Sequence, residues 1–556
     1  MFDSKRILDR TRESDKLPEL DKYWQVVRED PSDFNGWTYL LQYVDQENDV
    51  EATRDAYDCF LAMYPYCYGY WRKYAEYEKR QYSVDSESNC TRIYQKGLAA
   101  VPLSVDLWIH YLGHCKSIMG NNENLLREQF EQAVSKCGAE FRADRLWMLF
   151  IYWEMDNRHH QVLALFDRMF QIPLQNLETH FEKFQDFVNS QRPNVILSVD
   201  EFLAVRSYVV NKLKSKNGSG DSSADQPPGE GDADDVCSDE EITLVRKRII
   251  SLRHKVYKAT MAEVAARWPY EAAIKRPYFH IKPLEKSQLN NWHAYLDFEI
   301  EHGNVDRAVF LFERCLIACV MYPEFWLKYI KFLAASDCDP MTIRRVYRRA
   351  CLVHLTENVN LMLDWAFFEE MNCNKILARK ILKHAEKLSS DSILVQLHLI
   401  NFERRCGNLD KVRELFERYI ARAAQPSADK ALRAKYAQFY YHSLNDLDKA
   451  VELLRSAVEK YRDDPRLIYQ TIYLYLSANA GFDARLLDLI DGALQNDAYS
   501  SDDKLKFLQL KYEYCNDLGD DVAPVVDSLK AYSNLAGEQR NARFDKFDRA
   551  EMFYSK

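Results

Sequence analysis

Side chains that could bind a metal or attack a substrate are present, but their spacing favours other roles. Cys315 and Cys319 stand one helical turn apart, yet a zinc site needs two further ligands, and the apolar sequence CLIACV favours helix packing. His159 and His160 are adjacent, so on a helix they point about 100° apart and cannot chelate one metal as an i, i+4 pair could. The chain contains no G-x-x-x-x-G-K-[ST], H-E-x-x-H or G-x-S-x-G motif. We therefore predict that the protein is not an enzyme and has no catalytic, metal-binding or cofactor-binding residues.

Basic side chains are the other candidates, because clustered guanidinium and ammonium groups bind phosphates and acidic partners. The sequence IRRVYRRAC places four arginines in two i, i+4 rows on one predicted helix: Arg344, Arg345, Arg348 and Arg349. The stretch VRKRIISLRHK (245–255) adds five more Lys and Arg residues. Both stretches also fit ordinary solvated helix faces, and no RNA-recognition-motif or zinc-knuckle pattern occurs. We predict the four arginines as contacts with a partner or with RNA inside a larger particle, and direct RNA reading is the alternative.

The composition favours long helices joined by short connections. The chain has 556 residues, of which 47% are apolar, and it contains 35 Tyr and 28 Phe but only 16 Gly and 16 Pro. No run approaches 18 consecutive apolar residues, and the charged start MFDSKRILDRTRESD is unlike a secretory signal. The 13 cysteines include no C-x-x-C pair, which fits reduced thiols. We expect neither a membrane protein nor a secreted one.

One segment of the chain is strongly acidic. Residues 217–241 hold nine acidic residues and no Lys or Arg, so the rest of the chain is close to neutral although the formal net charge is −10. A Gly/Ser/Pro/Asp segment buries too little apolar surface to offset the entropy of ordering it. We predict a disordered loop over 211–241, and an acidic protein-binding motif is the alternative.

Tryptophans recur at the period of a helical hairpin. Pro31 and Trp37 are six residues apart, and the same spacing recurs at Pro65/Trp71 and Pro102/Trp108. Further tryptophans at the same place in the repeat are Trp147, Trp292 and Trp326. Because the residue before a proline avoids helical geometry, each proline is expected to end one hairpin, and the Trp then opens the next. The sequence predicts hairpins stacked through buried indoles.

Three other positions repeat with the tryptophan. An aromatic residue follows it by three in Tyr74, Tyr111, Tyr295 and Tyr329, and a glutamate follows it by seven in Glu78, Glu154 and Glu299. The second helix of each unit carries Arg-x-x-aromatic or Arg-x-x-aliphatic, as in Arg54/Tyr57 and Arg379/Leu382. We expect the Glu and Arg to pair within a hairpin and fix the helix register, and periodic surface charges of little energetic effect are the alternative.

Trp-x-x-Tyr-x-x-x-Glu followed by Arg-x-x-Tyr and a small residue resembles the half-a-tetratricopeptide (HAT) repeat of RNA-processing proteins. Long stretches resemble the HAT-repeat splicing-factor family associated with the U1 small nuclear ribonucleoprotein more closely, among them DPSDFNGWTYLLQYVDQEN (30–48), YPYCYGYWRKYAEYEKR (64–80) and VFLFERCLIACVMYPEFWLKY (309–329). The acidic segment departs from that family, and no long polar tail follows Lys556.

The resemblance implies an all-α, right-handed superhelix of HAT hairpins and a nuclear scaffold without enzymatic activity. It implies association with U1 proteins in 5′ splice-site recognition or alternative splicing, with any RNA contact indirect. It also implies a homodimer, or a heterodimer with a paralogue, through the C-terminal repeats. The alternatives are another RNA-processing HAT scaffold, such as a 3′-end cleavage-stimulation subunit, which should lack KRPYFHIKP (275–283), and a direct RNA binder.

We divide the chain into an extension (1–16), an N-terminal HAT block (17–210), the acidic loop (211–241), a C-terminal HAT block (242–540) with a connector (268–288), and a final segment (541–556). The connector should be extended, with Tyr278 and Phe279 as packed anchors, and a peptide-binding role is the alternative. The final segment carries an apolar stripe that either caps its own solenoid or, as the resemblance favours, docks in a partner subunit: Phe544, Phe547, Met552 and Phe553.

Overall fold

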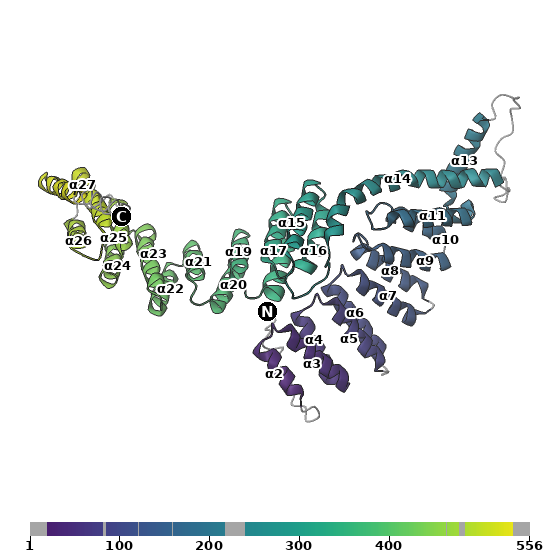
Figure 1. Ribbon diagram of the computed structural model, residues 1–556, viewed down its shortest axis with the longest axis horizontal. Coiled ribbons are helices and arrows are strands. Elements are labelled where there is room, and N and C mark those ends of the chain that lie inside the picture. Colours follow the sequence, from purple (N-terminus) through teal and green to yellow (C-terminus); the bar gives the residue numbers. More distant parts are fainter. Residues whose placement is uncertain are drawn as a thin grey trace, which may run out of the picture. The chain divides into compact units, whose positions relative to one another are not determined.

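The computed structural model describes residues 19–81, 85–120, 122–157, 159–216, 239–462, 464–477 and 484–537. All regular secondary structure in these residues is helical, and consecutive helices pack as antiparallel hairpins (Figure 1). The predicted all-α solenoid of HAT hairpins is therefore confirmed. The chain separates into two compact units, residues 1–361 and 362–556, and the boundary falls inside α19 (Val359–Met371).

The first unit begins with a run of stacked helices. These are α2 (Leu20–Glu29), α3 (Phe34–Glu47), α4 (Val50–Met63), α5 (Tyr68–Arg80), α6 (Ser86–Ala100), α7 (Val105–Met119), α8 (Glu123–Cys137), α9 (Asp144–Asn157), α10 (His159–Met169), α11 (Leu177–Ser190), the single turn α12 (Pro193–Ile196) and α13 (Val199–Lys216). Capping side chains fix several helix starts: Asp33, Asp49 and Ser104 accept hydrogen bonds from backbone N–H groups in the first turns of α3, α4 and α7.

The same unit continues through one long helix, α14 (Asp239–Ala273), which packs against α11 and α13. Beyond it lie α15 (Lys286–Glu301), α16 (Val305–Cys319), α17 (Pro323–Ala335), α18 (Pro340–Arg349) and a π-helical turn, η1 (Ala350–His354). Figure 1 shows α14 leading from the N-terminal hairpins to the hairpin α15/α16.

The predicted boundaries differ from the structure at two places. Residues 211–216 and 239–241 are helical, as the ends of α13 and α14, and the remainder of the predicted acidic loop lies outside the described residues. The connector is shorter than predicted, because α14 continues through Pro269 to Ala273 and α15 begins at Lys286. Ion pairs of Arg267 and Glu271 hold this last part of α14, which offsets the hydrogen bond that a proline removes.

The second unit holds α20 (Lys375–Leu388), α21 (Ile393–Arg405), α22 (Leu409–Arg422), α23 (Pro426–Leu444), α24 (Leu447–Lys460), α25 (Pro465–Ser477), α26 (Ala484–Leu494) and α27 (Ser501–Leu518), with a further helix over 523–537. Its last hairpins share a core around Ile472, Ile490 and Phe507, all fully buried. A smaller core joins α23 and α24 through Ala437, Ala450 and nearby residues.

Candidate functional site

The six-residue proline-to-tryptophan spacing is explained by a hydrogen bond. The indole N–H of Trp37 donates to the carbonyl oxygen of Pro31 at 3.0 Å, and Trp71 and Trp108 donate in the same way to Pro65 and Pro102 at 2.9 Å. Trp326 keeps the spacing with a valine, donating to Val320 O at 2.8 Å. Each bond closes the turn between two hairpins while the indole packs inside.

The predicted packing residues are buried, as expected. They are Trp37, Trp71, Tyr74, Glu78, Trp108, Tyr111, Trp147, Glu154, Trp292, Tyr295, Glu299, Trp326 and Tyr329. Two tryptophans vary the pattern: Trp147 donates to Gly138 O at 2.9 Å, and the N–H of Trp292 has no hydrogen-bond partner.

The aromatic residues of successive hairpins stack on one another. The ring of Tyr57 on α4 lies 5.0 Å from that of Tyr74 on α5, and Phe312 on α16 lies 4.8 Å from Tyr329 on α17. Phe130 and Phe150 stack at 4.8 Å in the same way between α8 and α9. The second helix of one hairpin thus supplies a ring to the first helix of the next, which sets how the two hairpins pack.

The recurring Glu and Arg pair between hairpins, so the prediction of pairing within a hairpin is wrong for the closest contacts. Arg54 on α4 holds Glu78 on α5 through bonds of 2.5 and 2.8 Å, and Arg379 on α20 holds Glu403 on α21 at 2.7 and 3.0 Å. The pairs Arg127/Glu154 and Arg267/Glu299 repeat this link. The reason is geometric: the Arg stands one turn before the stacking ring, and the Glu one turn after its partner ring.

A buried ion cluster that the sequence did not reveal lies where α14 and α16 meet the α8–α9 loop. Arg314 bonds Glu271 on α14, with Nη2 to Oε2 at 2.7 Å, and Glu140 in the loop at 2.8 Å. Tyr295 also donates to Glu271 at 2.9 Å. Burial raises the pKa of Glu140 above its usual range, against the opposing effect of Arg314. The sequence signal is weak: two charged residues, Glu313 and Arg314, interrupt the apolar run VFLFERCLIAC.

The connector after α14 contains no helix over 274–285 and lies against the first hairpins. Phe279 is buried, with its ring 6.1 Å from that of Tyr64, so this predicted anchor is confirmed. Tyr278 is 44% exposed, and its predicted anchor role is wrong, because adjacent residues of an extended chain point to opposite sides.

A histidine in η1 packs against the α4–α5 loop. The ring of His354 lies 4.4 Å from that of Tyr66. Burial lowers the pKa of His354 to about 3, which keeps the imidazole neutral.

The four candidate arginines do not form one open patch. Arg345 and Arg348 are exposed. Arg349 bonds Glu313 at 2.8 Å and lies 5.3 Å over the Trp326 ring, and Arg344 donates to Met341 Sδ at 2.8 Å. Burial alone would lower the pKa of Arg349, but Tyr66 and Glu313 outweigh it and raise the pKa. The four arginines do share one helix, α18, but Arg344 and Arg349 are engaged within the protein, and partner or RNA contact by the exposed pair stays a prediction.

Other predicted features either pack in the core or fall outside the description. Cys315 and Cys319 are fully buried, and burial raises the pKa of Cys315, so this thiol is not an activated nucleophile. Phe544, Phe547, Met552 and Phe553 lie outside the described residues. In the described part of the chain, no cluster of three or more His, Cys, Asp or Glu could hold a metal ion, and no helix is long and apolar enough to cross a membrane.

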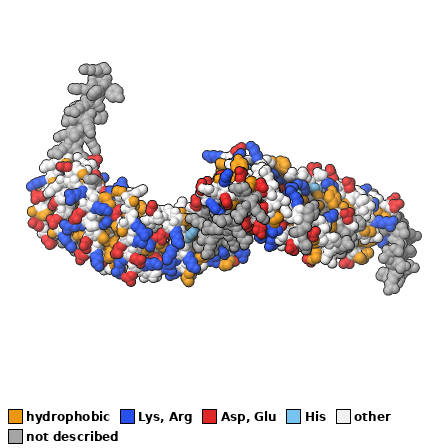
Figure 2. Space-filling view, turned by 90° about the horizontal axis from the view of Figure 1, so that it is seen from below, with side chains coloured by type: hydrophobic (Ala, Val, Ile, Leu, Met, Phe, Trp, Pro, Cys, Tyr) orange, Lys and Arg blue, Asp and Glu red, His pale blue; other side chains and the backbone are white. Residues whose placement is uncertain are grey.

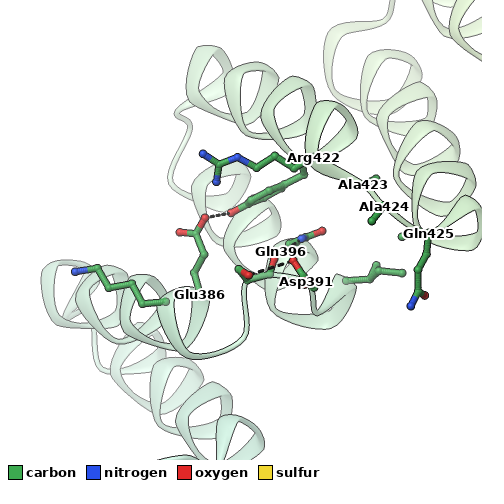
Figure 3. A pocket seen from close by; sticks show the side chains of 12 residues that line it. Glu386, Asp391, Gln396, Arg422, Ala423, Ala424 and Gln425 are labelled. Carbon is green, nitrogen blue, oxygen red and sulfur yellow. Dashed lines mark hydrogen bonds between the residues drawn. The ribbon is translucent and has the colours of Figure 1, made fainter.

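A pocket of about 460 Å³ opens in the second unit between the α20–α21 and α22–α23 loops (Figure 3). Glu386, Asp391 and Arg422 stand around it, and Tyr419 donates to Glu386 at 2.7 Å across it. The lining mixes both charge signs, as does the molecular face in Figure 2, so neither surface selects one ligand class by charge alone.

Comparisons with known proteins agree with the repeat architecture. Residues 21–186 match the family model of the PRP39 N-terminal HAT repeat, and residues 265–405 match that of the PRP39 C-terminal HAT repeat. The chain is 38% identical to pre-mRNA-processing factor 39 of Homo sapiens over 94% of this chain and 78% of that protein. It is 37% identical to the Xenopus laevis protein of the same name, over 94% and 81% of the two chains. The crystal structure of CstF-77 aligns with a TM-score of 0.49 and 13% identity over 86% of this chain and 89% of that one. The chain belongs to the pre-mRNA-processing factor 39 (PRP39) family of HAT-repeat proteins.

Proposed function

We propose that this protein is a non-enzymatic scaffold in pre-mRNA splicing that works in the nucleus with the U1 small nuclear ribonucleoprotein. Its role would lie in 5′ splice-site recognition or alternative splicing. The observation that carries the proposal is the 38% identity, sustained over 94% of the chain, to a protein named pre-mRNA-processing factor 39. Scaffolding also fits the role of the repeated charges, because the recurring Glu and Arg residues of the repeat pair with each other between hairpins instead of facing a substrate.

We further propose that the second unit forms a homodimer, or a heterodimer with a paralogue. Its last described part carries apolar side chains that stand open to solvent at the end of α27, in the connection after it and on the helix over 523–537: Leu518, Val522, Val526 and Leu529 are 38%, 70%, 40% and 49% exposed. An exposed apolar stripe at the end of a solenoid is unfavourable in water, so we expect another protein surface to bury it. A second copy of the chain supplies an identical apolar surface.

The test of the splicing proposal is affinity purification of the tagged full-length chain from nuclear extract. U1 RNA should be enriched over U2 RNA, and the U1 proteins should accompany it. The variant R345E/R348E asks whether the exposed arginines contribute, and K380E/K383E, with the same charge change on α20, is the matched control. If U1 RNA is no more enriched than U2 RNA with the unmodified chain, the proposal is wrong.

A further inference from the structure

A long stretch of α14 after its acidic first turn contains basic residues and no acidic ones. From residue 242 to residue 262 the helix contains six Lys and Arg residues and one His but no acidic residue, in a chain whose formal net charge is −10. Of the acidic residues at either end of this stretch, Glu241 pairs with Arg206 at 2.7 Å and Glu263 pairs with Arg267. Asp239 and Glu240 are exposed in the first turn of α14, about 10 Å or more along the helix axis from Lys247.

Two of the basic residues hold α14 in place and are not free for a ligand. Arg253 is buried and bonds Asp167 at 2.8 Å and Glu201 at 2.9 Å, and Arg246 donates to Gln191 O at 2.8 Å. These contacts fix which side of α14 faces the protein.

Three lysines stand on the opposite side. Lys247, Lys255 and Lys258 are exposed, and in the described part of the chain no ion pair engages them. On an α-helix they lie within about 80° of one another, on the side opposite Arg253, and span about 16 Å along the axis. Exposed Ser251 and His254 stand between them. We call Lys247, Lys255 and Lys258 the lysine ridge.

An aromatic ring borders the ridge. The guanidinium of Arg248 lies 4.0 Å from the ring centre of Tyr208 on α13, and Tyr208 is 45% exposed. A planar guanidinium held over a phenol ring offers a flat surface on which a nucleobase can stack. Acidic peptides gain nothing comparable from such a surface, so the combination favours nucleic acid over an acidic protein segment.

We propose that the lysine ridge binds the phosphodiester backbone of single-stranded RNA, and that a base of the same strand stacks on the Arg248–Tyr208 pair. The ridge supplies the sequence-independent charge contacts, and the ring supplies a contact that tolerates any base. This activity goes beyond scaffolding, and its failure would leave the splicing proposal standing.

The first experiment measures binding of the full chain to a fluorescent 20-nucleotide oligouridylate by anisotropy at several salt concentrations. The variant K247E/K255E/K258E should bind at least tenfold more weakly than the unmodified chain at 0.1 M salt. Its log–log salt slope should be smaller by about 2, because each single-strand phosphate contact contributes about 0.7. The variant K380E/K383E/K387E makes the same charge change at exposed lysines on α20 and should bind within about twofold of the unmodified chain.

A second variant separates stacking from charge. Tyr208→Leu should weaken binding about five- to tenfold and leave the salt slope unchanged, since it removes a ring and no charge. Circular dichroism checks that each variant keeps the helical content and melting temperature of the unmodified chain.

Two results would overturn the proposal. If the α14 and α20 triple variants lose RNA affinity equally, RNA binding depends only on the net charge of the chain and not on the lysine ridge. Binding of oligoglutamate through the lysine ridge, without measurable binding of RNA, would assign the ridge to an acidic protein partner instead.

Discussion

At the residue scale, the tryptophan of the repeat does two things that no other side chain combines. Its ring fills the space between hairpins, and its N–H satisfies the carbonyl oxygen six residues earlier. A phenylalanine keeps most of the first contribution and loses the second. Because a buried carbonyl without a partner carries a desolvation cost, the two contributions can be measured separately.

Substitutions at Trp37 make this separation directly, because Trp37 is fully buried and bonds Pro31 O. Trp37→Phe should lower the free energy of unfolding by about 1–2 kcal/mol, and Trp37→Ala by about 3–5 kcal/mol. Chemical denaturation followed by circular dichroism measures both. Tyr39→Ala, a change at a 60% exposed residue of the same helix, is the control and should cost no more than about 0.5 kcal/mol. No loss in Trp37→Phe would contradict the role of the hydrogen bond.

At the element scale, the ion pairs between hairpins make each hairpin depend on its neighbour. Glu403 on α21 is fully buried, and burial alone would raise its pKa, but the bonds from Arg379 and Asn408 outweigh burial and lower the pKa. A carboxyl with a lowered folded-state pKa contributes stability above its unfolded pKa, and that stability is lost as the pH falls through the folded value.

Arg379→Met tests this link. It should lower the free energy of unfolding by about 2–3 kcal/mol at pH 7, less than for a fully isolated charge because Asn408 and Lys411 still contact Glu403. The difference from the unmodified chain should shrink as the pH falls toward 4, where Glu403 of the variant becomes protonated. The control Arg405→Met breaks the more exposed Arg405/Glu370 pair and should cost about 1 kcal/mol or less. A pH-independent loss in Arg379→Met would contradict the assignment.

In the cluster around Arg314 the carboxyl pKa is shifted in the opposite direction, because burial raises the pKa of Glu140. Arg314→Met leaves Glu140 and Glu271 buried together without their cation, which should cost about 3–5 kcal/mol at pH 7. Burial already raises the pKa of Glu140 above its unfolded value, so protonation favours the fold and stability should recover as the pH falls. Denaturation between pH 4 and 8 measures this recovery. The triple variant R314M/E140Q/E271Q, which removes both charges, should be more stable at pH 7 than Arg314→Met alone, and equal stability would refute the cluster.

The elements themselves were largely predictable, and their partners were not. The proline-to-tryptophan spacing is a local signal, so Trp37, Trp71 and Trp108 predicted buried hairpin starts from sequence alone. The partner of Glu78 could not be predicted in the same way. The helices before and after α5 both neighbour it in sequence, so the spacing does not show which of them supplies the arginine. Arg314 and Glu140 are far apart in sequence, so the repeat pattern, which relates residues of neighbouring helices, could not predict their ion pair.

At the scale of the whole molecule, we expect a dimer through the second unit. Light scattering at micromolar concentration should give twice the 65.5 kDa chain mass. The variant V522E/V526E, which places charges in the exposed apolar stripe, should shift the mass toward that of one chain. The control V199E/L203E places the same charges at exposed apolar residues of α13 and should remain dimeric. One chain mass for the unmodified protein would count against the dimer.

Action as a splicing scaffold with the U1 particle can be measured by depletion and add-back. Nuclear extract depleted of the endogenous PRP39-family protein is mixed with an immobilised RNA that contains a 5′ splice site, and the retained U1 RNA is quantified. Depletion should lower U1 retention, and the purified chain should restore it. Retention unchanged by depletion, or not restored by the purified chain, would rule out this role.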